Sequence, residues 1–214
     1  MSFFSEIYAT AKLGGVLMIP LSLLSILAIA LIFDKIMFYK KSIYLPQSLL
    51  ALIETYNFSW KKLEDELEKL PQENCYRRFF SVIAHNKNRP VWWLESRAAD
   101  EAKLIEKNLV STLWILETIT TVAPLLGLLG TIVGMMSSFK IIGDAGLVNP
   151  SGVTAGVAES LIATGFGLAI AIISLFAFNY FSRRSDEVMD EMERLGTRVI
   201  DHVRIETAQP VFSH

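Results

Sequence analysis

Residues 156–172 read GVAESLIATGFGLAIAI, an apolar stretch with a single carboxylate, Glu159. They belong to a longer run, Val153 to Phe181, in which Glu159 is the only charged residue. A helix of about 20 apolar residues crosses a bilayer, so this run predicts a transmembrane helix. A carboxylate in hydrocarbon costs roughly 3 kcal/mol or more and normally faces a bundle interior or a water-filled cavity. Glu159 is therefore the first candidate functional residue.

Two other runs are long and apolar enough to span a bilayer. Leu13 to Phe33 carries no charge, and Leu113 to Phe139 carries only Glu117. Of the 214 residues, 52% are hydrophobic, which is too apolar for an ordinary water-soluble domain. We expect an all-α integral membrane protein with three transmembrane helices, two of which extend into the cytoplasm, and a helical cytoplasmic domain.

Lysine and arginine indicate how the chain is oriented in the membrane. Thirteen basic residues lie between Lys35 and Asn108 and five lie after Ser182, whereas residues 143–152 contain none. The amino terminus is therefore expected to be periplasmic and the carboxyl terminus cytoplasmic. The predicted segments are a periplasmic start (1–12), transmembrane helix 1 (13–38), a cytoplasmic domain (39–112), transmembrane helix 2 (113–142), a periplasmic loop (143–152), transmembrane helix 3 (153–181) and a cytoplasmic helix and tail (182–214).

The cytoplasmic segments are expected to be helical. Pro46 and Ser59 stand where helices can begin, and residues 97–110 contain no Gly or Pro, so we expect them to continue unbroken into the second transmembrane helix. The tail carries apolar residues at helical spacing, which predicts a helix packed on that extension. These residues are Val188, Met192, Leu195, Val199 and Val203.

Both of the later transmembrane helices carry a stripe of small residues, which lets helix backbones approach closely. On the third helix the small residues fall within roughly 140° of one face, together with Glu159. The residues expected to pack are Pro124, Gly127, Gly130, Gly134, Gly156, Ser160, Ala163 and Gly167. Tight helix packing explains the glycines but explains Glu159 poorly. One chain with three helices encloses no large polar cavity and cannot satisfy two small-residue faces. We therefore expect an oligomer whose small-residue faces surround a proton or ion path.

These two stripes resemble the signature motifs of the ExbB/TolQ/MotA family of proton-channel proteins. Residues 121–139, TVAPLLGLLGTIVGMMSSF, are similar to the family's proline followed by G-L-x-G-T-x-x-G-M. Residues 156–172 are similar to its A-E-[AS]-L-x-A-T-x-x-G-L-x-x-A-I. The resemblance covers roughly residues 95 to 205, and the three-helix topology and the motif glutamate resemble ExbB and TolQ more than MotA.

The resemblance implies a homopentamer in the bacterial inner membrane around a dimer of a single-span partner, ExbD-like or TolR-like, which carries an essential aspartate. Thr131 and Thr164 would line the axis beside that aspartate, Glu159 would face the same interior, and Pro124 would shape the second helix. Proton flow would then energise a TonB-like protein for outer-membrane transport. Phe166 stands where the family often has a smaller residue.

Two alternatives stay open: a TolQ-like role in envelope maintenance, and a purely structural membrane scaffold with Glu159 as a hydrogen-bonded pillar. The sequence contains no paired catalytic groups, zinc spacing or phosphate loop, so we expect neither an enzyme nor a cofactor. The sequence has no basic patch that would indicate nucleic-acid binding. The transmembrane helices are expected to contact membrane lipids. The single cysteine, Cys75, excludes an internal disulfide and is expected to be structural.

Overall fold

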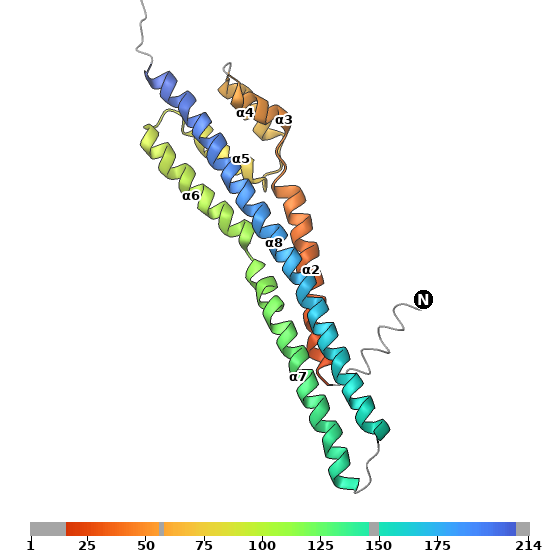
Figure 1. Ribbon diagram of the computed structural model, residues 1–214. Helices are drawn as coiled ribbons and strands as arrows, with labels where there is room; N and C mark the ends of the chain where they lie inside the picture. Colours follow the sequence, from red (N-terminus) through yellow and green to blue (C-terminus); the bar gives the residue numbers. More distant parts are fainter. Residues whose placement is uncertain (1–15, 56–57, 146–149, 209–214) are drawn as a thin grey trace, which may run out of the picture. The chain divides into compact units, whose positions relative to one another are not determined.

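The computed structural model describes residues 16–55, 58–145 and 150–208, and all regular elements in these ranges are α-helices (Figure 1). They are α2 (Met18–Ser42), α3 (Gln47–Glu54), α4 (Trp60–Glu68), α5 (Cys75–His85), α6 (Val91–Val110), α7 (Leu113–Ala145) and α8 (Pro150–Ala208). Three stretches, in α2, in Val91–Phe139 and in α8, are long and apolar enough to cross a membrane. The predicted all-helical chain with three candidate transmembrane helices is therefore confirmed.

The chain divides into two compact units. We call the first the membrane unit; it comprises the described residues of Met1–Phe33 and Thr112–Tyr180. We call the second the helical unit; it comprises the described residues of Asp34–Ser111 and Phe181–His214. Each unit is described by itself.

In the membrane unit, many large apolar side chains lie outside, and small side chains share the interior with a few large ones such as Leu21 and Leu116. Ala123 and Ala163 are buried, whereas Leu125, Leu161 and Phe176 are exposed. A water-soluble protein would bury the large apolar side chains instead, because their removal from water drives folding. In a bilayer, outward apolar side chains contact lipid at no such cost, and close packing falls to the small residues. This distribution agrees with a membrane-spanning helix bundle.

The helical unit has an ordinary apolar core. It is formed by the end of α2 from Asp34 on, by α3 to α6 and by the part of α8 that follows Tyr180. The expected stripe on α8 is buried along its whole length. Pro46 and Ser59 are the N-cap residues of α3 and α4, as predicted. Asn74 caps α5, because its side-chain oxygen accepts hydrogen bonds from the backbone N–H groups of Tyr76 and Arg77, at 3.0 and 3.1 Å.

Polar contacts then join the helices of this unit. The Tyr76 hydroxyl of α5 donates to the Glu191 carboxylate of α8 at 2.6 Å. Arg78 of α5 forms an ion pair with Glu101 of α6, also at 2.6 Å. Burial of Tyr76 raises the pKa of its hydroxyl well above the usual range, so Tyr76 stays protonated and keeps donating this hydrogen bond.

The expected unbroken helix from residue 97 into the second transmembrane helix is wrong. Helix α6 ends at Val110, α7 begins at Leu113, and Thr112 between them has a φ of 68°. The Lys35 ammonium of α2 donates to the carbonyl oxygen of Leu109 at 2.9 Å. The Tyr39 hydroxyl, also of α2, shares its one proton between this oxygen, at 3.3 Å, and the carbonyl oxygen of Phe181, at 3.1 Å. The Leu109 carbonyl belongs to the last turn of α6, where carbonyls lack an intrahelical partner. Side chains distant in sequence therefore stabilise the helix end.

Candidate functional site

The two small-residue stripes of the membrane unit face each other within one chain. A Cβ atom added at Gly167 would lie 2.5 Å from the Ala123 carbonyl oxygen. One added at Gly134 would lie 2.7 Å from the Cβ of Ser160. Position 123 thus opposes 167, and position 134 opposes 160, so α7 and α8 run antiparallel, as Figure 1 also shows. Their backbones approach so closely that only glycine fits at these positions.

This pairing corrects one expectation from the sequence. We expected that a single chain could not satisfy two small-residue faces, and the oligomer was inferred partly on that ground. Gly127 packs on Thr164, Gly130 on Ala163, and Gly156 on Ser138, all inside the same chain. The stripes therefore form an intramolecular contact between α7 and α8, and an oligomeric ring must be supported on other grounds.

Thr164 joins the two helices by a hydrogen bond. Its hydroxyl donates to the backbone carbonyl oxygen of Gly127 at 2.8 Å. This carbonyl is accessible because Gly127 has no side chain: a Cβ there would lie 2.9 Å from the Cα of Thr164. The close approach and the hydrogen bond are thus consequences of the same glycine. Thr164 is half-buried, and in this conformation its hydroxyl proton is engaged in helix packing.

Thr131 has a different environment. Its hydroxyl donates to the carbonyl oxygen of Leu128 in its own helix at 2.7 Å, and its side chain is half-buried. A hydroxyl oxygen that donates one hydrogen bond can still accept others. Thr131 therefore adds no hydrogen bond between α7 and α8, and its oxygen keeps accepting capacity for a water molecule or a protonated carboxyl group.

The remaining predicted residues lie on the same two helices. Glu159 is in α8 directly before the buried Ser160, and its side chain lies outside the described part of the molecule. Pro124 lies inside α7, which continues from Leu113 to Ala145 despite the missing backbone N–H. Its side chain is half-buried, one residue after the fully buried Ala123. The structure thus places Pro124, Thr131, Thr164 and position 159 on one antiparallel helix pair.

The described side chains of this helix pair include no candidate metal site. Among the described residues, no group of three or more His, Cys, Asp or Glu side chains could hold a metal ion. The described groups around the pair offer hydroxyls and backbone carbonyls, which can pass or hold a proton through hydrogen bonds but provide no nucleophile with a neighbouring base.

Comparison with known proteins identifies the family. Residues 68–194, more than half of the chain, match the MotA/TolQ/ExbB proton channel family. The chain belongs to this family. The matched region contains both small-residue stripes and the two threonines, so the site described above is also the family's shared region.

Among the members of the MotA/TolQ/ExbB family, the chain is most like ExbB. It is 35% identical over 175 residues to the putative biopolymer transport protein ExbB-like 3 of Synechocystis sp.. The aligned region covers 78% of this chain and 81% of that relative. It is 38% identical over 91 residues to biopolymer transport protein ExbB of Aquifex aeolicus, covering 42% of this chain and 62% of the relative. The Tol-Pal system protein TolQ of Pseudomonas aeruginosa is 40% identical over 81 residues, 38% of this chain and 35% of the relative.

The sequence missed the contact made by Lys35 and Tyr39 at the end of α6. Lys35 is almost fully buried, with 3% of its surface exposed, and its ammonium also lies 3.4 Å from the Ser111 hydroxyl. The signal was present but ambiguous: Lys35 lies just after an apolar run, and a lysine in that position is ordinarily solvated. Only the tertiary structure shows that it caps another helix.

Proposed function

We propose that the protein is an ExbB-like subunit of a motor in the bacterial inner membrane that is driven by the proton-motive force. In this proposal five copies surround a dimer of an ExbD-like single-span protein, and the complex energises a TonB-like protein for active transport across the outer membrane. The amino terminus is periplasmic and the carboxyl terminus cytoplasmic. The family membership and the names of the relatives support this assignment.

The observation that carries the proposal is the antiparallel pair of α7 and α8. Two family motifs lie on helices that pack through glycine, so threonines 131 and 164 and position 159 are held on a rigid support. A site built on packed helices keeps its geometry while a partner moves against it. An intramembrane carboxylate on such a support is expensive to maintain, which favours a functional role for Glu159.

The residues of this chain would act on protons through hydrogen bonds. The Thr131 oxygen can accept from a protonated carboxyl group or a water molecule, whereas the Thr164 hydroxyl is held by Gly127 and fixes the distance between the helices. Glu159 would exchange its proton with water or with the partner's aspartate as the partner moves. A transfer between Glu159 and the aspartate would move the negative charge from one to the other, and exchange with water would add or remove it; either change would favour a different position of the partner.

A deletion strain tests the proposed role. Loss of the gene should abolish energised uptake of outer-membrane substrates and leave the envelope intact, and a single-span protein encoded nearby should copurify with the chain. Envelope leakage and detergent sensitivity with normal uptake would instead support the TolQ-like role. The similarity to a TolQ protein makes this role the alternative.

A purely structural scaffold is the second candidate, because the Thr164 hydroxyl is engaged in packing in this conformation. In a scaffold, the chain would stabilise its partner without conducting protons. Proton flux through the reconstituted complex, with and without the partner, separates the two: flux that requires both proteins supports the motor, and no flux at normal assembly supports the scaffold.

A further inference from the structure

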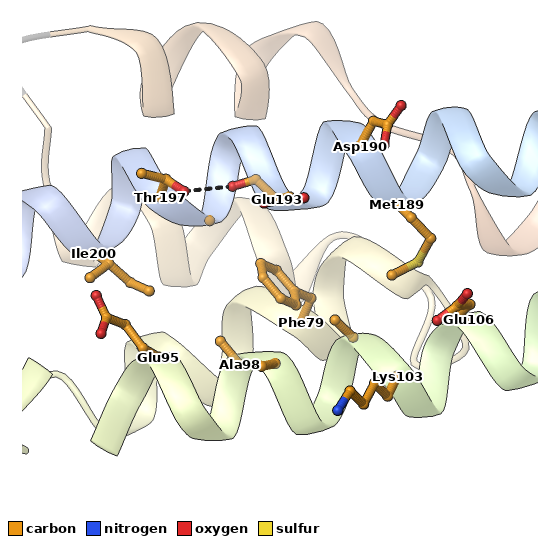
Figure 2. Close-up of a pocket in the computed structure, with 13 residues that line it drawn as sticks. Phe79, Glu95, Ala98, Lys103, Glu106, Met189, Asp190, Glu193, Thr197 and Ile200 are labelled. Carbon is orange, nitrogen blue, oxygen red and sulfur yellow. Dashed lines mark hydrogen bonds between the residues drawn. The ribbon is translucent and has the colours of Figure 1, made fainter. Parts of the chain in front are cut away.

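A groove of about 460 Å³ lies between α6 and α8 in the helical unit, and no predicted site residue contributes to it (Figure 2). Phe79 of α5 lies between the two helices at its base. Figure 2 shows Glu95 and Ile200 at one end and Glu106 and Met189 at the other. The helices that form the walls therefore run antiparallel.

The groove exists because its walls are made of small residues. Ala98 and Ala102 line it from α6, and Gly196 lines it from α8. A Cβ at Gly196 would lie 2.7 Å from Cζ of Phe79, so this glycine lets the ring sit directly against the α8 backbone. Larger side chains at these positions would fill the space, as they do in the rest of the core of the unit.

The rim of the groove is acidic. Its charged residues are Glu95, Glu106, Asp190, Glu193 and Lys103. Glu95, at one end of the groove, forms an ion pair with Arg204. Within residues 16–55, 58–145 and 150–208, no ion pair engages Glu106, Asp190 or Glu193. Three carboxylates therefore border an apolar floor without a basic partner, and Lys103 offsets only one charge.

The length of the groove matches a short helix. Glu95 and Glu106 lie about three helical turns apart, or about 16 Å along α6 at the rise of an α-helix. A helix that docks in a groove between two other helices places its apolar side chains against the small residues of the groove walls. A cation near each free carboxylate of the rim would complete the charge balance.

We propose that this groove is a docking site for a partner protein's helical segment of about three turns, apolar on one face and flanked by lysine or arginine. The apolar face would lie over Phe79 and the alanines, and the flanking cations would pair with Glu106, Asp190 and Glu193. The proposal does not depend on proton conduction by the membrane unit, so the two can fail separately.

A designed peptide tests this site on the full-length chain in nanodiscs of uncharged phosphatidylcholine. The probe is a fluorescent 14-residue helix of leucine, alanine and lysine, with leucine on one face and lysine beside it; empty nanodiscs give the background. Ala102→Trp should fill the groove, and its matched control is Leu104→Trp, an exposed position on α6 outside the groove. Asp190→Lys should repel the lysines, and its control is Asp65→Lys, exposed on α4.

We expect both groove variants to raise the dissociation constant of the probe at least about fivefold and both controls to leave it unchanged. Binding should also weaken with added salt. Equal binding of a scrambled peptide of the same composition, or unchanged binding to Asp190→Lys and Ala102→Trp, would overturn the proposal. A third result would also overturn it: the unaltered chain does not bind the probe, and the groove variants change their oligomeric state. In that case a second copy of the chain would occupy the groove.

Discussion

Replacing Gly167 by alanine should separate α7 from α8. The new Cβ would lie 2.5 Å from the Ala123 carbonyl oxygen and 3.3 Å from the Cα of Gly127, and both atoms belong to the backbone of α7. An ordinary contact begins near 3.4 Å, so the helices must move apart by about 0.9 Å at this point. A side chain could rotate away from such a clash, but a helix backbone moves only as a unit.

The separation has a second cost at the neighbouring turn. The hydrogen bond from the Thr164 hydroxyl to the Gly127 carbonyl oxygen is 2.8 Å long, and an increase of about 0.9 Å would break it. Overpacking costs about 1–3 kcal/mol, and an interhelical hydrogen bond in a membrane contributes roughly 0.6 kcal/mol. The helix propensity gained with alanine offsets at most about 1 kcal/mol. A net loss of about 2 kcal/mol follows.

Gly165→Ala is the matched control. It introduces the same methyl group in the same helix two residues away, and no heavy atom lies within 4 Å of the added Cβ. The assay is reversible unfolding of both variants in mixed detergent micelles, followed by circular dichroism. We expect Gly167→Ala to unfold at a lower fraction of the denaturing detergent than the unaltered chain. Gly165→Ala gains the same helix propensity without the clash, so we expect it to be at least as stable as the unaltered chain. Equal stability of the two variants would refute the close approach of α7 and α8.

Three further predictions concern other positions. Gly134→Leu should reduce the yield of assembled protein on size-exclusion chromatography, whereas Ile132→Leu, outside the packed stripe, should not; equal yields would contradict the assigned face. Thr164→Val should destabilise the chain in detergent unfolding by roughly 0.6 kcal/mol, and Thr131→Val by less, since only the first removes an interhelical hydrogen bond; the reverse order would count against this pairing. Burial raises the pKa of the Cys75 thiol to about 11 from a usual value of 9.0, so the folded chain should resist alkylation below pH 9. The raised pKa belongs to the folded state, so burial of the neutral thiol contributes fully to the free energy of unfolding below pH 9. This contribution is lost as the pH rises toward 11, and Cys75→Ala should reduce that loss of stability.

Much of the fold follows from local properties of the sequence. The long apolar runs, the helix starts at Pro46 and Ser59 and the buried stripe on α8 depend on periodicity and capping within a few residues. The break at Thr112 could not be predicted, because no Gly or Pro marks it. It is stabilised by Lys35 and Tyr39, more than 60 residues away in the sequence.

The candidate site, too, was predictable where it depends on local sequence and unpredictable where it depends on tertiary contacts. Small residues at helical spacing predict that α7 and α8 pack closely, but not which surfaces they meet. From the sequence we expected Gly134 and Ser160 to lie on faces that one chain cannot satisfy, whereas the structure places them against each other in the same chain. Likewise, Thr131 and Thr164 look equivalent in their motifs, yet only Thr164 donates across to the other helix. Such distinctions depend on rotation about each helix axis, which periodicity fixes only roughly.

Replacing Glu159 by glutamine tests the central claim, that this chain conducts protons through its intramembrane carboxyl group. Glutamine keeps the size and hydrogen-bonding capacity of the protonated acid but cannot release a proton. The measurement is energised uptake in cells with matched levels of assembled complex, with Glu159→Ala as a control for loss of the side chain. We expect Glu159→Gln to assemble normally and to lose energised uptake. Full uptake by Glu159→Gln would contradict the claim and leave Glu159 as a structural pillar.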